Sequence, residues 1–389
     1  MKYRCVDTFS LRFRRMKKFE VNLFLIVIVM VLFFSCKTEK DNPVAECENE
    51  EFFCEFDSRN FEMGFSTWPY ASTIASVENT YDFIGENGDI YSEHIDSNIP
   101  WNAWINDLSL PAEFTNDIAS RASKKLTNTK LTVSVSLLNS SRSDLAFDYD
   151  GSIPNYTALN DKEIEDAYFQ HLQYIAEQLN PDYLLLAIEV NELLKNAPEK
   201  WEAYKILMAK IRPRIQEEFP TLQISESITL HNFYQPDVPN PDGFIEEIAN
   251  YANTMDLVTI SFYPFFKGLK SEQDFKRAFD FLHEKIKKPI AIAETSHLAE
   301  DLSVESLNLF IAGNESEQND YLKTLFTQAQ IHDYEYIIWW AHRDFDALWE
   351  TFPEEVKDLG RIWRDTGLLD EDGRGRRSYE TWESVLNPL

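Results

Sequence analysis

The sequence predicts an α/β fold, a (β/α)8 TIM barrel formed by a single domain. Short apolar runs rich in β-branched and aromatic residues alternate with longer segments of helical periodicity. Eight such runs are present, and an alternation repeated eight times is typical of this barrel. A doubly wound open sheet also alternates strand and helix, but it usually carries a glycine-rich phosphate turn after its first strand. Here the first run continues as STWPYAST, which has no such turn.

The expected strands follow one another along the chain with helical segments between them. They are 61–66, 90–95, 131–138, 183–191, 223–230, 257–263, 289–294 and 334–341. The clearest helical segments are 161–179, 199–219 and 271–286. Several of these segments start on Asp or Ser with an acidic residue soon after, as helix N-termini prefer.

The N-terminal segment 1–36 is predicted to be a targeting signal that lies outside the fold. A basic start at Met16 is followed by an apolar run, 21–34, which is shorter than the roughly 20 residues of a membrane-spanning helix. Ser35-Cys36 follows the run directly, and this arrangement resembles a bacterial lipoprotein signal with Cys36 as the lipidated residue. Met16 is an alternative start of the chain. Plain cleavage and an uncleaved anchor are the alternatives to lipidation.

Two further segments complete the expected domain organisation. Residues 37–51 are polar and acidic, which predicts a flexible linker, and residues 52–389 form the expected catalytic domain. Cys47 and Cys54 either close a short disulfide in an oxidising compartment or remain free thiols. The expected location is the bacterial cell envelope, with the chain anchored by lipid at the outer membrane or cell surface.

Composition restricts the partners. The chain has 37 Lys and Arg against 66 Asp and Glu, a formal charge of -29, and such a surface repels phosphate backbones. Nucleic acid is therefore excluded as the expected partner, and the only membrane contact expected is through the lipid. No Cys and His cluster has zinc spacing and no acidic segment has the spacing of a calcium loop, so no metal or other cofactor is expected. A monomer is expected.

Two glutamates stand where predicted strands end. Glu192 follows Asn191 at the end of the fourth strand, and Glu294 ends the seventh strand in PIAIAETSH. Catalytic residues of a (β/α)8 barrel lie at the carboxyl ends of its strands. A single glutamate at such a position is more often a capping residue or half of an ion pair, so it is the pairing of the two that favours catalysis.

These residues resemble clan A of the retaining glycoside hydrolases, in which the acid/base glutamate follows an asparagine at strand four and the nucleophile ends strand seven. Within the clan the sequence is nearest to the family 53 endo-β-1,4-galactanases, through the Asn-Glu pair, ISFYPFF and AETSH. The resemblance covers strands four to eight. Those galactanases carry an arginine on strand two, where this chain has Glu93 and His94.

The resemblance implies a retaining glycoside hydrolase in which Glu294 is the nucleophile and Glu192 the acid/base. Retention requires two carboxyl groups roughly 5 Å apart, one attacking the anomeric carbon and one protonating the leaving oxygen. Tyr263 at the end of the sixth strand is placed to donate a hydrogen bond to Glu294, and otherwise is a packing residue. Asn191 is expected to bond the sugar 2-hydroxyl.

Aromatic side chains near the strand ends are candidates for sugar binding. Trp340 ends the eighth strand, Trp68 follows the first and Trp101 follows the second. The alternative is that these tryptophans fill the core or lie beneath a loop. Trp339 is expected to face the helices.

His94 is a weaker candidate for substrate binding. His297 is weaker still, and Glu189 is alternatively an internal polar residue paired with a neighbour.

The expected function is hydrolysis of a β-linked polysaccharide or oligosaccharide by double displacement, as in an endo-β-galactanase or another β-glycanase. The alternative is a surface glycan-binding lipoprotein that keeps the barrel without turnover. Because both candidate catalytic positions are occupied by glutamate, the sequence favours the enzyme.

Overall fold

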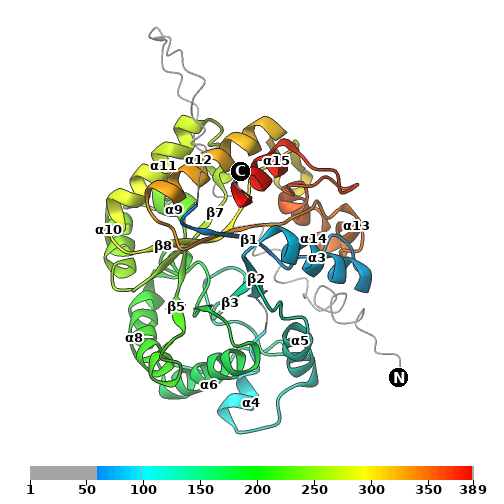
Figure 1. The fold of residues 1–389 in the computed structure, drawn as a ribbon. Helices are drawn as coiled ribbons and strands as arrows, with labels where there is room; N and C mark the ends of the chain where they lie inside the picture. The colour runs from blue at the N-terminus through cyan, green and yellow to red at the C-terminus, as the bar shows by residue number, and fades with distance from the viewer. Residues whose placement is uncertain (1–58, 97, 388–389) are drawn as a thin grey trace.

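The computed structural model describes residues 59–96 and 98–387. The predicted signal, linker and cysteines 36, 47 and 54 lie outside this range. Helices surround a central set of strands (Figure 1). Within the described part of the chain, no helix combines the length and the apolar character that crossing a bilayer requires.

The central sheet is a barrel of eight strand positions. Its strands are β1 (Glu62–Ser66), β2 (Ile90–Ile95), β3 (Lys130–Val135), β4 (Tyr183–Leu185), β5 (Gln223–Ser225), β6 (Ser227–Thr229), β7 (Val258–Phe262), β8 (Ile290–Thr295) and β11 (Tyr336–Trp339). They pair in the order β5-β4-β3-β2-β1-β11-β8-β7-β6, and all these pairs are parallel. Only Glu226 separates β5 from β6, so the two edges of the sheet belong to one interrupted strand and the barrel closes through it.

The predicted (β/α)8 barrel is therefore confirmed. The three helical segments expected from the sequence are also present, as α6 (Lys162–Leu179), α8 (Trp201–Glu218) and α11 (Glu272–Lys285). The other long helices are α3 (Ile74–Asn87), α5 (Ala112–Ala122), α10 (Pro241–Ala252), α12 (Glu315–Ile331) and α15 (Arg377–Leu386). A capping box starts α11, in which Ser271 and Asp274 satisfy each other's backbone N–H groups.

Short elements occupy the loops. They are α4 (Trp101–Ile105), α7 (Asn191–Asn196), α9 (Leu230–Tyr234), α13 (Asp346–Trp349), α14 (Glu354–Lys357), the hairpin β9 (Leu302–Val304) and β10 (Leu309–Ile311), and the 3₁₀ helices η1 (Pro198–Lys200), η2 (Pro264–Lys267), η3 (Glu305–Leu307) and η4 (Leu359–Trp363). Helices α7 and α9 and η2 come shortly after β4, β6 and β7, so they stand at the carboxyl rim.

The fourth strand differs from its prediction. It ends at Leu185 rather than at residue 191, and α7 begins at Asn191. The intervening segment still follows its neighbour, because Leu186 N donates to Ser225 O and Val190 N donates to Ser227 O. Glu189 has a φ of 55°, in the left-handed region, and this conformation turns the chain out of the strand. Glu192 consequently stands in the first turn of a short helix instead of on a strand.

The core is continuous on both sides of the sheet. Inside the barrel, Tyr183, Leu257 and Tyr336 belong to a buried apolar cluster at the strand starts. A larger cluster fills the space between the strands and the helices. At Gly64 in β1 a Cβ would lie 1.5 Å from Ile90 O, so the close approach of β1 and β2 needs a glycine.

Candidate active site

Glu294 lies on β8 at the carboxyl rim, where it contacts two other strand ends. The hydroxyl of Tyr263 donates a hydrogen bond to Glu294 Oε1, so the bond expected from the sequence is present. On the other oxygen, His94 Nδ1 lies 3.4 Å from Glu294 Oε2. Burial, together with Glu294, raises the pKa of Tyr263 well above its usual value, which keeps the phenol protonated as a donor. Glu294 is therefore held from both sides.

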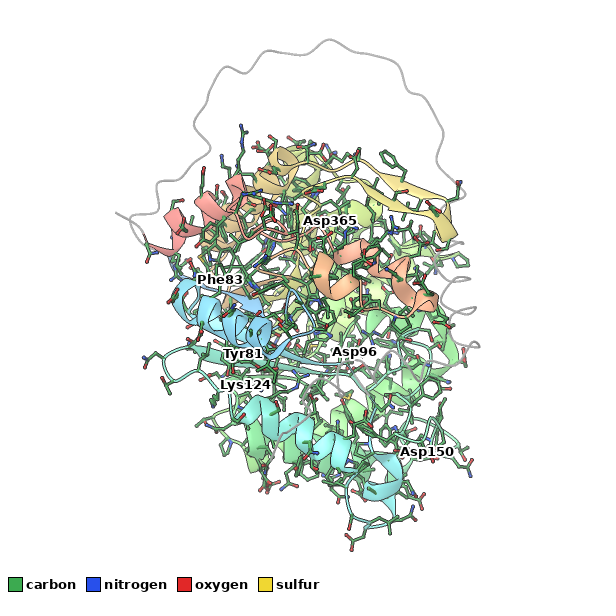
Figure 2. The ribbon with its side chains drawn as sticks, turned by 90° about the vertical axis from the view of Figure 1, so that its right-hand side faces the viewer. Tyr81, Phe83, Asp96, Lys124, Asp150 and Asp365 are labelled. Carbon is green, nitrogen blue, oxygen red and sulfur yellow. The ribbon has the colours of Figure 1, made fainter. Side chains whose placement is uncertain are left out.

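His94 connects Glu294 to the end of β2. Burial favours the neutral ring, but Asp96 and Glu294 outweigh burial and raise the pKa of His94 above its ordinary value. Figure 2 shows Asp96, which follows β2, to the right of Lys124, which precedes β3. A protonated His94 places positive charge beside Glu294 Oε2.

Glu192 is fixed by Thr229, at the end of the fifth strand, and by Asn232, which follows it in α9. Its Oε1 accepts hydrogen bonds from Thr229 Oγ1 and from Asn232 Nδ2, the latter at 2.7 Å. Its Oε2 lies 3.9 Å from Lys195 Nζ, and both of these side chains are only 12% exposed. Because Oε1 already accepts two hydrogen bonds, Oε2 is the oxygen that can carry a proton to a substrate.

The side-chain amide of Asn191 was expected to bond a sugar hydroxyl, but in the structure it bonds Thr229. Its side-chain amide donates to Thr229 O (3.1 Å) and Thr229 Oγ1 (2.9 Å) and accepts from Thr229 N (2.8 Å), and the residue is fully buried. Both amide protons are therefore used inside the protein, and no donor is left for a sugar hydroxyl. Asn191 connects α7 to the fifth strand and thereby positions Glu192.

Glu189 is paired with a buried arginine that the sequence analysis missed. Arg142, in the loop after β3, donates to Glu189 Oε2 at 3.3 and 3.2 Å and to Asp96 at 3.1 and 2.9 Å. Ser261 Oγ donates to Glu189 Oε1 at 2.9 Å. Burial raises the pKa of Glu189, Arg142 opposes this, and the nearby Glu294 and Glu192 raise it further. Glu189 is thus an internal polar residue paired with a neighbour.

Arg142 reaches Glu294 only indirectly, through Asp96 and His94. Burial favours the neutral form of Asp96, but Arg142 outweighs burial and holds the pKa of Asp96 well below its usual range. His94 lowers this pKa further. The only signal in the sequence is a single arginine in the segment NSSRSD after the third predicted strand. Nothing in that segment indicates that its side chain reaches across to the ends of β2 and β4.

Two tryptophans extend the site beside His94. The rings of Trp68 and Trp340 lie 5.1 Å apart between centroids, and the His94 ring meets Trp340 edge-on at 5.7 Å. Both tryptophans are partly exposed, and they follow the adjacent strands β1 and β11. Trp340 precedes a cis peptide bond to Ala341. The preceding Trp339 faces the helices as expected, because it is fully buried and its ring lies 6.1 Å from that of Tyr321 in α12.

Trp101 does not share this surface. It is 1% exposed, its Nε1 donates to Ala146 O at 2.8 Å, and its ring packs against Tyr168 of α6. The alternative of a core tryptophan is the one that the structure supports, and Trp101 is not carried into the substrate site. His297 is also buried away from Glu294, with its ring nitrogens near Leu298 O and Leu269 O.

Replacing Trp101 with alanine should destabilise the protein by about 3–5 kcal/mol, because a large buried side chain is removed and a cavity remains. Urea unfolding measures the change. Leu108→Ala, at a position 55% exposed, is the control and should change stability by no more than about 0.5 kcal/mol. Unchanged stability with a raised KM for glycan would instead return Trp101 to the substrate site.

Two groups of carboxylates near α13 are close enough to hold a metal ion. Their ligand atoms lie within 4.8 Å of one another, and the groups are Glu300, Asp344 and Glu371, and Asp344, Asp346 and Asp365. Arginines already occupy them. Arg376 donates to Glu300 and Asp344 at 2.6 and 2.7 Å, and Arg364 donates twice to Asp365 at 2.7 Å. These hydrogen bonds to arginine give the two groups a structural role. Burial raises the pKa of Asp344 to about 8 in spite of Arg376.

Comparison with known proteins identifies the class to which this site belongs. Residues 169–333 match the model of glycosyl hydrolase family 53, a segment that is less than half of the chain but includes both Glu192 and Glu294. The chain is therefore a glycoside hydrolase, and over these residues it is similar to family 53. None of the curated proteins matches the sequence of this glycoside hydrolase.

Solved structures share its barrel at low sequence identity. The Ignisphaera aggregans GH53 catalytic domain has 17% identity and a TM-score of 0.53, over 78% of this chain and 88% of that one. A GH5_18 protein from Streptomyces cattleya, in complex with Manβ1-4GlcNAc, has 13% identity and a TM-score of 0.58, over 84% and 80%. The exo-β-1,4-mannosidase Op5Man5 from Opitutaceae bacterium strain TAV5 has 12% identity and a TM-score of 0.57, over 84% and 59%. These similarities establish the fold of the hydrolase.

Proposed function

We propose that the protein hydrolyses β-linked glycans with retention of configuration, with Glu294 as nucleophile and Glu192 as acid/base. The observation that carries the proposal is that both glutamates lie at the carboxyl rim of the barrel, with each fixed in a different way. Glu294 is held between a tyrosine and a histidine, whereas Glu192 has one oxygen bonded and the other free to exchange a proton.

The first step forms a glycosyl ester. A carboxylate oxygen of Glu294 attacks the anomeric carbon, the bond from that carbon to the glycosidic oxygen breaks, and Glu192 gives its proton to the departing oxygen. The Tyr263 hydroxyl and His94 hold Glu294 in position for the attack. Proximity and orientation of the reacting groups supply much of the rate enhancement in such a step.

The second step releases the sugar. Glu192, now ionised, removes a proton from water, the water oxygen attacks the anomeric carbon, and the ester bond to Glu294 breaks. Two inversions at the same carbon give net retention. The Trp68 and Trp340 rings provide apolar faces beside the nucleophile, on which a sugar ring can stack.

The substrate class follows from comparison and is tested by a panel. The family 53 match favours an endo-β-1,4-galactanase, and the mannosidase and the Manβ1-4GlcNAc complex among the structural neighbours favour including mannan. Purified protein should release reducing sugar from one or more of galactan, β-glucan, mannan and xylan. Binding to a glycan without any release would instead indicate the alternative, a surface glycan-binding lipoprotein.

We further propose that Cys36 carries lipid and anchors the enzyme, as a monomer, to the bacterial cell envelope at the outer membrane or cell surface. Cys36→Ala should then release the protein from the membrane fraction or leave the precursor unprocessed, because the acylated sulfur is lost. Fractionation followed by mass determination checks both outcomes. Cys5→Ala is the matched control and should leave anchoring unchanged. Membrane retention with normal processing in Cys36→Ala would contradict lipidation.

A further inference from the structure

Basic residues lie near Glu192 on three neighbouring elements of the carboxyl rim. Lys195 lies on α7, His231 on α9 and Lys267 at the end of η2. The first of these approaches Glu192 Oε2 to 3.9 Å. The protein as a whole has a formal charge of -29, so two lysines near Glu192 are opposite in sign to the general charge of the molecule.

Lys195 has a largely buried side chain, and its ammonium group has no hydrogen-bond acceptor among the described residues. Its side chain is 12% exposed, and Glu192 at 3.9 Å is the one carboxylate paired with it in that part of the chain. The first step of the proposed reaction requires Glu192 in its protonated form. In that form Lys195 has no anionic partner among the described residues, and an anionic group placed beside its ammonium group would be attracted to it.

Lys267 adds to the positive potential. Its side chain is 7% exposed and its ammonium group forms a salt bridge with the partly exposed Asp237. Burial lowers the pKa of Lys267, Asp237 opposes this, and Lys195 lowers it further. Burial likewise lowers the pKa of His231 to about 3, with contributions from Lys267 and Lys195, so the His231 ring is neutral. Lys195 and Lys267 therefore lie close enough to each other and to His231 for their charges to interact.

We propose that Lys195, supported by Lys267, forms a subsite for an anionic substituent of the glycan on the leaving-group side of the cleft. This inference rests on the proposed function, because it is Glu192 Oε2 that delivers the proton to the leaving oxygen. The sugar attached to that oxygen must then lie near Lys195 Nζ. A carboxylate of a uronic acid or a sulfate ester supplies the missing acceptor, and a charge-assisted hydrogen bond of this kind is stronger than a neutral one.

A competing explanation is that Lys195 serves only the charge on Glu192. In that case its removal would affect every substrate alike. An anion subsite has a different signature, because removal of Lys195 would affect only those glycans that carry the charge. The discriminating quantity is therefore the ratio of affinities between an anionic glycan and its neutral counterpart.

The experiment measures glycan binding to the full chain carrying Glu294→Gln, so that turnover does not remove the ligand. The probes are two pairs of oligosaccharides, one from glucuronic-acid-substituted xylan and its carboxyl-reduced form, and one from sulfated galactan and its desulfated form. At low ionic strength we expect Kd for the anionic member of one pair to be about tenfold lower than for its neutral partner. The pair that shows the difference distinguishes carboxylate from sulfate.

Adding Lys195→Gln should bring that ratio to about one, whereas Lys195→Arg should retain a preference for the anionic glycan. Lys276→Gln removes the same charge from an exposed position on α11 and is the matched control that should leave the ratio unchanged. Equal affinity for both members of both pairs overturns the proposal. So does a Lys195→Gln variant that keeps the preference, or one that weakens both members equally.

Hydrolysis of the neutral panel by the wild-type protein tests the proposed function separately. Hydrolysis without any charge preference in binding would refute the anion subsite and leave the glycosidase intact. A charge preference that depends on Lys195 without hydrolysis of any glycan would support the subsite and refute the catalytic proposal.

Discussion

Glu294→Ala should lose activity on every glycan and every aryl glycoside, with a fall in kcat on the order of 10⁵-fold. Without the carboxylate no glycosyl ester forms, and a better leaving group does not replace the missing nucleophile. Initial rates with polysaccharide and with a 2,4-dinitrophenyl β-glycoside measure the loss. Because the variant lacks only a rim side chain, its unfolding transition should stay cooperative.

Glu305→Ala is the matched control for this prediction. It removes an exposed glutamate from η3, in the segment that connects β8 to α12. Both rates should stay close to those of the wild-type protein. Activity of Glu294→Ala within about tenfold of wild type on either substrate would be incompatible with Glu294 as the nucleophile.

Glu192→Ala should divide substrates by their leaving groups. Polysaccharide cleavage should fall by roughly 10³-fold or more, because a sugar alkoxide is a poor leaving group unless an acid protonates it. An activated aryl glycoside should still glycosylate Glu294, since a dinitrophenolate departs without protonation. Hydrolysis of the resulting ester should then be slow, because no base activates water.

Azide provides the control for that variant. As an anion it attacks the ester without a general base, so added azide should increase turnover of the activated aryl glycoside by Glu192→Ala and should not change turnover by the wild-type protein. Thr229 and Asn232, which bond Glu192 Oε1, are retained in this variant. Full polysaccharide activity in Glu192→Ala would show that another group is the acid.

Strand positions could be predicted because each depends on local composition. Every one of the eight apolar runs contains a strand, and the helices between them follow from periodicity and capping residues. The end of the fourth strand could not be predicted in this way. The segment after Leu185 has the composition of a strand, but Glu189 adopts a left-handed backbone conformation. In this conformation its side chain contacts Arg142 and Ser261.

The fifth strand shows the same limit. Glu226 interrupts it between β5 and β6, fully buried and bonded to Arg212, Tyr204 and Tyr251 from α8 and α10. The glutamate is visible in QISESITL, but its three partners lie on the flanking helices α8 and α10, 14 to 25 residues away. A buried carboxylate of this kind requires such partners, and only the packed structure shows which residues they are.

Within the site, strand-end residues were predictable and loop residues were not. Glu294 and Tyr263 follow from the rule that barrel strands carry functional groups at their carboxyl ends, whereas Glu192 lies at the same rim but in the first turn of α7. Arg142 and Lys195 depend on how loops fold over the rim, and the burial of Trp101 depends on contacts with Ala146 and α6. Loop conformation is set by long-range packing, which periodicity does not report.

The central claim is that Glu294 attacks and Glu192 transfers protons, and the anomeric configuration of the azide adduct tests it most directly. The account predicts that Glu192→Ala, given an activated aryl β-glycoside and azide, yields the β-glycosyl azide, identified by its anomeric proton coupling in NMR spectra. Displacement from an α-linked ester on Glu294 produces that anomer. An α-glycosyl azide formed by Glu294→Ala, with no adduct from Glu192→Ala, would reverse the two roles.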